Sequence, residues 1–348
     1  MLGCGTRHGE GNVMGDGVGW PAGADEVIKG DLTAAAAYLT SAGGAVVTGV
    51  APCGIGDRDR GVLGYTTSLG FGKKLERIVA DPHVALAFHA REHGFSASPA
   101  FVLAQGTASV DLTPSRQRLE ALTPQVERYL GEVKRGVVWD RLLREYYAER
   151  VVVDITVARV AVWPDLNASG DMQVTGVAWP GPAGPQSPPR GGTGPRVDVA
   201  KAAGQIAARP HRVLAYRGAD GFPVVVPVQI AGHDAAGLRL VAAAGLLPPG
   251  GRRAGLLAHA YRPQLVGLST RIFTGWLEAG GDGAVYAPHT SKGFVVPPNK
   301  NTLLVLNGLL AKFGMWQARR HGTADQLERL AAARALAGAG EGGQPPPG

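Results

Sequence analysis

The sequence predicts an α+β fold of two modules in tandem, each built round a small antiparallel β-barrel. Three observations predict it: short β-rich runs alternate with a few helical stretches, a proline- and glycine-rich segment interrupts them at residues 179–196, and the pattern then begins again. At 348 residues the chain is long enough for two domains that each bury a core. We therefore expect a first module over residues 25–178 and a second over 197–335.

Composition places the two ends and the junction outside the folded modules. The 52 glycines and 25 prolines concentrate at the start, the middle and the end. This distribution predicts a disordered arm at residues 1–24, a linker at 179–196 and a disordered tail at 336–348.

The cysteine count and the hydropathy pattern indicate the cellular compartment in which the protein is expected. Cys4 and Cys53 are too few for a disulfide framework or a four-cysteine metal site. No apolar stretch reaches the roughly 20 residues that span a bilayer, and the first 30 residues lack a basic region followed by an apolar core. We expect a soluble, cytoplasmic protein that does not engage membranes.

The net charge of +7 raises the question of nucleic-acid binding. The basic residues are scattered through mixed-charge stretches and aromatic residues make up only 6% of the chain, so neither a charged stripe nor a stacking platform stands out. A small anionic ligand accounts for the charge equally well, and nucleic acid is not the favoured partner.

The first module is expected to contain helices inserted among short strands. Asp31 is placed to cap a helix over "LTAAAAYLT". The elements expected after it are the strands "GAVVTGV" and "RGVLGYTTS", a helix from Leu75 to Ala80, the strands "HVALAFHA" and "FVLAQGTASV", a helix opened by Thr113-Pro114, a helix ending in "WDRLLREYYAE" and the β run "RVVVDITVARVAVW".

The second module is expected to repeat the first. Its predicted elements are a helix over "VDVAKAAGQIAA", the strands "HRVLAYRG", "FPVVVPVQIAG" and "GLRLVAAAG", a helical "AGLLAHAY" and, last, C-terminal helices. A gap-free alignment of "GYTTSLGFGKK" with "AAGLLPPGGRR" places Lys73 and Lys74 on Arg252 and Arg253, each pair at the start of a helix after a glycine loop. The same alignment replaces the hydroxyl residues of the first copy by Leu246, Leu247 and Pro248, so the second copy is expected to lack an anion site.

A candidate anion site lies where "GYTTS" leads into a glycine loop and a helix. Thr66, Thr67 and Ser68 offer hydroxyls at the end of a strand, and Lys73 and Lys74 offer ammonium groups at the start of the helix. Helix N-termini favour negative charge, and hydroxyls and cations add hydrogen bonds, so this combination is typical of a phosphate cradle. The alternative is that the lysines are solvated and the threonines merely fill the end of a strand.

The order of these motifs resembles the pyridoxamine 5'-phosphate oxidase-like family, the FMN-binding split barrels. The likeness consists of an apolar strand ending in Tyr-Thr, a glycine loop, two basic residues, Asp-Pro, "HVALAF" and "VLAQGTASV", over roughly residues 30–165 and more weakly over 197–290. The first module departs from it near "APCGIGDRDRG", where a strand is missing from the expected elements, whereas the second keeps a Gly-x-Pro hairpin in "ADGFPVVVPV".

The resemblance implies two split β-barrels that form an internal pseudo-dimer, with further self-association left open. It implies that Lys73 and Lys74 bind the phosphate of FMN with help from Thr66, Thr67 and Ser68, or bind the related deazaflavin coenzyme in the same way. The implied function is hydride transfer to a small organic substrate. Two alternatives stay open: a non-catalytic flavin- or haem-related binding protein of the same fold, and a module that binds nucleic acid or protein.

Other polar and aromatic residues carry weaker hypotheses. His89 and His93 end a strand and enter a loop, so a surface role is favoured over a metal site. Polar residues after the second barrel, in "VYAPHTSKGF", either line a groove or form an ordinary loop, and the loop is favoured; they are Tyr286, His289 and Lys292. Trp163 and Trp276 are expected in a core or an interface.

Overall fold

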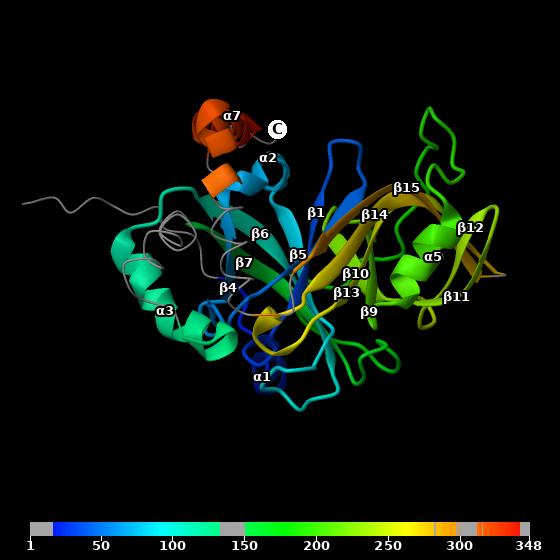
Figure 1. Cartoon of the computed structure of the whole chain (residues 1–348), viewed down its shortest axis with the longest axis horizontal. Helices are drawn as coiled ribbons and strands as arrows, with labels where there is room; N and C mark the ends of the chain where they lie inside the picture. Colours follow the sequence, from blue (N-terminus) through cyan, green and yellow to red (C-terminus); the bar gives the residue numbers. More distant parts are fainter. Residues whose placement is uncertain are drawn as a thin grey trace, which may run out of the picture.

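A computed structural model of the chain shows two antiparallel β-sheets, one after the other along the sequence (Figure 1). The structure describes residues 17–132, 150–281, 283–296, 299, 312–314 and 316–341. The expected helix ending in "WDRLLREYYAE" lies outside these residues. Helices accompany both sheets, so the α+β class is confirmed.

The first sheet has eight strands and the second has seven. The strands of the first are β1 (Ala34–Leu39), β2 (Ala45–Val50), β3 (Gly56–Asp57), β4 (Val62–Ser68), β5 (His83–Phe88), β6 (Phe101–Asp111), β7 (Arg150–Trp163) and β8 (Gln173–Gly176). Those of the second are β9 (His211–Arg217), β10 (Pro223–Pro227), β11 (Gln229–Asp234), β12 (Gly237–Val241), β13 (Gly250–Ala260), β14 (Ser269–Gly280) and β15 (Gly283–Val295).

The two sheets have the same topology. The first runs β2-β1-β5-β6-β7-β4-β3, with β8 paired to β7, and the second runs β10-β9-β13-β14-β15-β12-β11. Strands β1 to β7 therefore correspond in order to β9 to β15. This shared strand order confirms the expected tandem repeat.

The register fixes the correspondence residue by residue. Tyr38 pairs with Val84, which pairs with Gly106 beside a bulge. In the second sheet Tyr216 pairs with Ala254, which pairs with Gly275 beside a bulge at the same place. On each glycine a Cβ would lie 2.2 Å from a carbonyl oxygen of the next strand, so both bulges depend on a residue without a side chain.

The helices differ between the modules. The first module carries α1 (Ala22–Ile28), the short 3-10 helix η1 (Leu69–Phe71), α2 (Gly72–Ala80) and α3 (Arg116–Leu130). The second begins with α5 (Val199–Ala207), which precedes β9 as α1 precedes β1, and contains the 3-10 helix η2 (Pro263–Leu265). Residues 242–249, all of them described, form no counterpart of α2.

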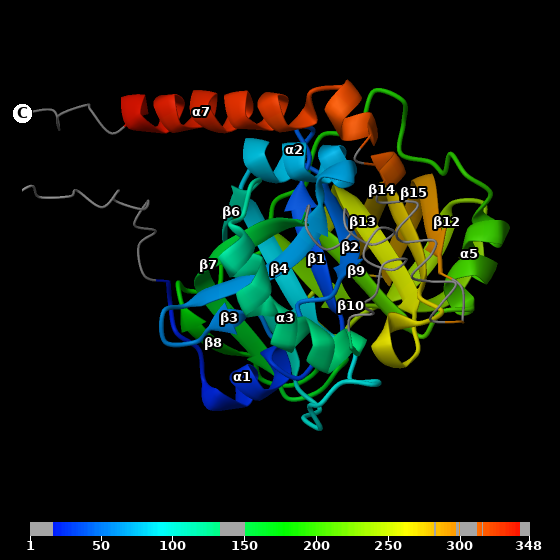
Figure 2. The same cartoon turned by 60° about the vertical axis from the view of Figure 1, so that its left-hand side comes forward.

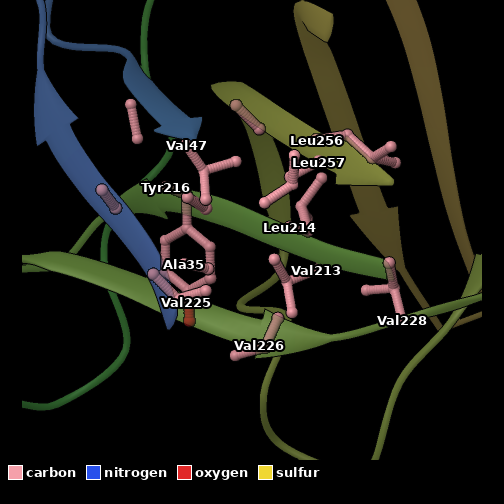
Figure 3. Packing of buried hydrophobic residues seen from close by; sticks show 14 of the residues in the cluster. Ala35, Val47, Val213, Leu214, Tyr216, Val225, Val226, Val228, Leu256 and Leu257 are labelled. Atoms are coloured by element: carbon pink, nitrogen blue, oxygen red, sulfur yellow. The ribbon is translucent and has the colours of Figure 1, made fainter. Parts of the chain in front are cut away.

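The two modules share one hydrophobic core. Ala35 and Val47 of the first sheet belong to the same buried cluster as Val213 and Leu256 of the second, and Figure 3 shows these side chains in one group. At the crossing of β2 and β13 a Cβ on Gly255 would lie 2.7 Å from a carbonyl oxygen of β2. This close contact shows that the modules pack as an internal pseudo-dimer.

The expected helix over "LTAAAAYLT" is wrong, because these residues form β1. All six residues of β1 are buried, and the strand lies between β2 and β5. Pairing on both edges and burial on both faces therefore outweigh the helix propensity of the four alanines. Near "APCGIGDRDRG", where the first module was expected to lack a strand, the structure has the two-residue strand β3, which pairs with β4.

The expected helix at "AGLLAHAY" is wrong for the same reason. The segment belongs to β13, a central strand between β9 and β14, and an apolar run buried on both faces has no periodicity that separates strand from helix. Arg252 and Arg253 consequently lie within a strand rather than at a helix start. Arg252 is buried and donates to the carbonyl oxygens of Ala183, Pro248 and Pro249, which is a structural role.

The described ends of the chain pack against the first module. Trp20 and Ala24, in the segment expected to be a disordered arm, are buried in its core. The C-terminal helix α7 (Thr323–Glu341), expected with the second module, instead lies along α2, and Leu327 is buried in the first module's core (Figure 2). It also continues into the segment expected to be a disordered tail. No helix within the described residues is long and apolar enough to cross a membrane.

Candidate functional site

The candidate site lies where β4 passes through η1 into α2. Ser68 ends the strand, and its Oγ accepts a hydrogen bond of 3.1 Å from the backbone N–H of Gly70, which fixes the turn. No side chain caps the start of α2, and the first turn of this fully described helix contains no acidic residue. Lys73 and Lys74 lie in that turn, so two cations stand at the positive end of the helix dipole.

Lys74 is the most perturbed group of the site. Its Nζ lies 4.6 Å from the ring centroid of Tyr65, a cation–π distance. Burial, with a smaller contribution from the positive charge of Arg150, lowers the pKa of Lys74 to about 7. Among the described residues no carboxylate pairs with this ammonium, so a bound anion would stabilise its charged form.

The other predicted residues do not all face Lys74. Alternation along β4 places Thr67 on the same face as Tyr65, where Thr67 is 6% exposed. Thr66 lies on the opposite face and accepts hydrogen bonds of 2.7 and 3.2 Å from Arg150. Lys73 is exposed to solvent. The structure therefore groups Lys74 with Thr67 and separates Thr66 from them.

Two residues of this site were missed by sequence reasoning. Arg150 begins β7 and pairs directly with Ser68, a register that only the folded sheet establishes. Tyr65 provides the ring beneath Lys74, and its place in "GYTTS" was noted only as part of a motif. The alternating positions of Tyr65 and Thr67 in a strand could have identified them as one face.

The C-terminal segment lies beside the same loop. A Cβ on Gly70 would be 3.0 Å from Gly314, and a Cβ on Gly72 would be 3.0 Å from the methyl group of Thr323. Arg334 donates to the backbone carbonyl oxygen of Val79 at 3.0 Å. The C-terminal segment thus covers one side of the start of α2, whereas Lys73 stays exposed.

The second module has no equivalent set of hydroxyls. Leu63 pairs with Ile155, and Leu238 pairs with Tyr286 at the same point of the second sheet. Counting along the strands from these positions matches Thr66, Thr67 and Ser68 to Val241, Ala242 and Ala243, not to Leu246, Leu247 and Pro248 as the gap-free alignment had it. The loss of the hydroxyls remains, but the residues that replace them are different.

Histidines meet at the junction of the two modules. His89 follows β5 and His259 lies at the matching position of β13, and their Nε2 atoms are 2.7 Å apart. Because Nδ1 of His89 lies 3.1 Å from the carbonyl oxygen of Ala87, it carries the proton, and His259 donates to Nε2 of His89. Burial lowers the pKa of His89 to about 3, so both rings are neutral.

The expected surface role of His89 is therefore wrong, because it is 7% exposed. His93 lies in the loop after β5 with a positive φ of 60°. Within the described part of the chain no group of three or more histidine, cysteine, aspartate or glutamate residues is arranged to hold a metal ion.

A pocket of about 500 Å³ opens beside these histidines. His211 lines it at the start of β9, and its Nε2 lies 3.1 Å from a carboxylate oxygen of Glu92 in the first module. Burial lowers the pKa of His211, whereas Glu92 opposes that shift. The walls come from both modules, since His89 and Asn167 of the first face Gln229 and Val241 of the second.

The residues of "VYAPHTSKGF" form neither a loop nor a groove lining, because they belong to β15. Tyr286 is fully buried, and its hydroxyl donates to the carbonyl oxygen of Ala254 at 3.2 Å. Lys292 is exposed. Trp163 and Trp276 are each 3% exposed, which confirms the expected buried positions.

No family model and no curated protein matches this chain. Among solved structures, a pyridoxinephosphate oxidase-family protein from Clostridium acetobutylicum, related to general stress protein 26, is 13% identical over 44% of this chain and 92% of its own, with a TM-score of 0.32. An F420 reductase is 17% identical over 40% of this chain and 98% of its own, with a TM-score of 0.30. A pyridoxamine 5'-phosphate oxidase-related, FMN-binding protein from Nostoc punctiforme is 9% identical over 57% of this chain and 87% of its own, with a TM-score of 0.27.

Proposed function

We propose that this chain is a flavin- or deazaflavin-dependent oxidoreductase of the pyridoxamine 5'-phosphate oxidase-like family, which transfers a hydride to a small organic substrate. The observation that carries the proposal is Lys74, a half-buried ammonium at a helix N-terminus with no carboxylate partner among the described residues. The order of motifs from "GYTTS" to "VLAQGTASV" supports the family.

The residues present fit the phosphate of such a cofactor. Two lysines at the positive end of a helix repel the helix dipole and each other, and an anion relieves both effects. Lys74 and the backbone N–H groups at the start of α2 would bind the phosphate, with Thr67 on the same face and Lys73 at the solvent side. The second module has no lysine and no hydroxyl at the matching positions, so we expect one cofactor per chain.

The protein's own contribution is binding and orientation. A bound flavin or deazaflavin supplies the hydride chemistry from its ring system. Burial raises the pKa of Tyr65 and of Tyr38, so both phenols stay neutral and do not compete with the phosphate for Lys74. A bound phosphate would favour the charged form of Lys74, while the two phenols stay uncharged.

The same proposal includes the partner, the compartment and the arrangement of the modules. The partner is a small-molecule substrate, the compartment is the cytoplasm, and the two modules at 25–178 and 197–335 act as one pseudo-dimer. The linker keeps the second module at a high effective concentration beside the first. Further self-association is compatible with this arrangement.

Cofactor titration tests the proposal. FMN and the deazaflavin coenzyme are titrated separately into wild type and into Lys74→Ala and Lys73→Ala variants, with bound cofactor followed by fluorescence and absorbance from 300 to 500 nm. Lys201→Ala is the matched control, because Lys201 is an exposed lysine in the first turn of α5 in the second module.

We expect tight binding of one cofactor, a loss of at least tenfold in Lys74→Ala, a smaller loss in Lys73→Ala and no change in the control. Binding that Lys74→Ala leaves intact would overturn the phosphate seat. A cofactor that binds tightly yet is never reduced by any hydride donor would instead support the non-catalytic binding protein.

A further inference from the structure

We propose that the pocket between the two modules is a second ligand site, which binds a small organic carboxylate with an apolar body. It is distinct from the start of α2, and it needs no cofactor. Its volume of about 500 Å³ lies in the range of small-molecule sites.

The apolar part of the pocket comes from the end of β12 in the second module, where apolar residues replace the hydroxyl residues of the first module. Val241, Ala242 and Ala243 occupy the positions that Thr66, Thr67 and Ser68 occupy in the first module, and all three line the pocket. Leu166 and Val228 add to the same surface. A phosphate would find neither hydroxyls nor a helix N-terminus at this strand end, whereas an apolar ligand body would bury its surface there.

The polar part of the pocket is cationic. Arg212 lines it, and its Nε and Nη2 donate to the carbonyl oxygens of Ile206 and Ala207 at the end of α5, each at 3.2 Å. These bonds hold the guanidinium in place, and within the described chain its Nη1 has no hydrogen-bond partner. Among the described residues that line the pocket there is no carboxylate, and the neutral polar ones are Asn167, Ser169 and Gln229.

His211 adds a group that responds to the ligand's charge. Its Nε2–H donates to Glu92, so Nδ1 is the nitrogen left for a ligand. The neutral ring offers only a lone pair there, but a carboxylate favours the imidazolium, which Glu92 already stabilises on the far side. Binding is therefore expected to raise the pKa of His211 and to take up a proton.

The neighbours of His211 do not supply a competing anion. His89 uses both ring nitrogens, one on Ala87 and one on His259. The other groups that face His211 are His93, His259, Tyr261 and Arg212, and none of them is a carboxylate. Glu92 is the one acidic partner in direct contact among the described residues, and it is on the side away from Nδ1.

Benzoate is the probe, and benzamide is the uncharged ligand of the same shape. Calorimetry on the full chain without flavin measures both at pH 6, 7 and 8, in two buffers of different ionisation enthalpy. We expect benzoate to bind at least tenfold more tightly than benzamide, to bind more tightly as the pH falls, and to take up protons. Equal binding of the two ligands, or no binding of benzoate, would overturn the proposal.

Variants locate the site. Arg212→Gln is expected to weaken benzoate binding at least tenfold, whereas Arg217→Gln, at the other end of β9, serves as the control. Because Arg212 also holds the end of α5, a second variant, Ala242→Phe, fills the pocket and is expected to abolish binding without lowering the melting temperature. Benzoate binding that survives both variants would place it elsewhere. Failure here leaves the cofactor titration untouched, because the cofactor is proposed to bind at a separate site.

Discussion

The Nε2 atoms of His89 and His259 lie 2.7 Å apart, so two residues at matching positions of the two modules touch each other. An interface made by the same patch of two related units brings a residue close to its own counterpart. Here that contact is a single hydrogen bond between two neutral imidazoles, and its direction is set by the carbonyl oxygen of Ala87. Protonation of His89 would break this bond, because the imidazolium has no lone pair with which to accept it.

The buried histidine pair predicts acid sensitivity. The folded-state pKa of His89 is about 3 and its ordinary value is 6.5, so below pH 6.5 the unfolded chain binds a proton that the folded chain does not. The free energy of unfolding therefore falls as the pH drops from 6.5 towards 3, by about 2 kcal/mol for this residue at pH 5. Urea unfolding at pH 7.5 and pH 5 measures the difference.

A His89→Asn variant should show a smaller difference between the two pH values, even if it is less stable at both. His233→Asn, at an exposed histidine of β11, should behave like the wild type. An unchanged pH dependence in His89→Asn would show that His89 is not the group responsible.

The bulge glycines predict equal sensitivity in the two modules. Gly106→Ala and Gly275→Ala each place a Cβ 2.2 Å from a backbone carbonyl oxygen, on Thr156 and on Ala287. Strands must shift to relieve the clash, at a cost of about 2–3 kcal/mol each. Thermal unfolding compares them with Gly49→Ala, where no atom lies within 4 Å of the added Cβ. A large loss in only one module would contradict the shared register.

A salt bridge between a buried arginine and a partly exposed aspartate joins the two modules. Arg159 of β7 is 1% exposed and pairs with Asp220 of the second module at 2.5 Å. Asp220→Ala leaves the guanidinium buried without its carboxylate, which we expect to cost about 3 kcal/mol. The double variant Arg159→Met, Asp220→Ala should be more stable than Asp220→Ala alone. If the double variant is the less stable of the two, the unpaired charge is not the cause.

The contact of α7 with α2 predicts that loosening α7 exposes α2 to solvent. Leu327 is 2% exposed, and truncation in Leu327→Ala should let α7 separate from α2. Backbone amides of α2 should then exchange with solvent at least tenfold faster, as hydrogen exchange with mass spectrometry measures. Glu328→Ala, at the exposed neighbouring position, is the control. Unchanged exchange in Leu327→Ala would show that α7 does not protect α2.

Local patterns in the sequence located much of the fold correctly. Alternation and turn residues predicted β2, β4 to β7, β9 and β12, and one strand where the structure has β10 and β11. Helix caps and flanking loops predicted α2, α3 and α5. The strands β1 and β13 were predicted as helices, because an apolar run buried on both faces carries no period that separates strand from helix. Part of β15 was predicted as a loop. The strand missing near "APCGIGDRDRG" is β3, whose two residues are too few to carry a strand pattern. The error at β13 shifted the alignment of the repeats.

For the candidate site, the sequence by itself placed hydroxyls, a glycine loop and two lysines in order along the chain. This order follows from neighbours in sequence, so local chemistry was enough to find it. Only the tertiary structure decided that Lys74 lies over Tyr65, that Thr66 is engaged by Arg150, and that α7 covers the loop. Each of these depends on strand register or on a contact between distant segments.

The contacts at the junction of the modules could not be predicted from the sequence. His89, His211 and Glu92 are far apart along the chain, and each resembles an ordinary polar residue at the end of a strand. Their meeting depends on how two repeats of one sheet pack across a shared core, which long-range burial of apolar side chains decides. The sequence by itself determined that there are two repeats with one altered strand end. Their packing determined that the altered end lines a pocket.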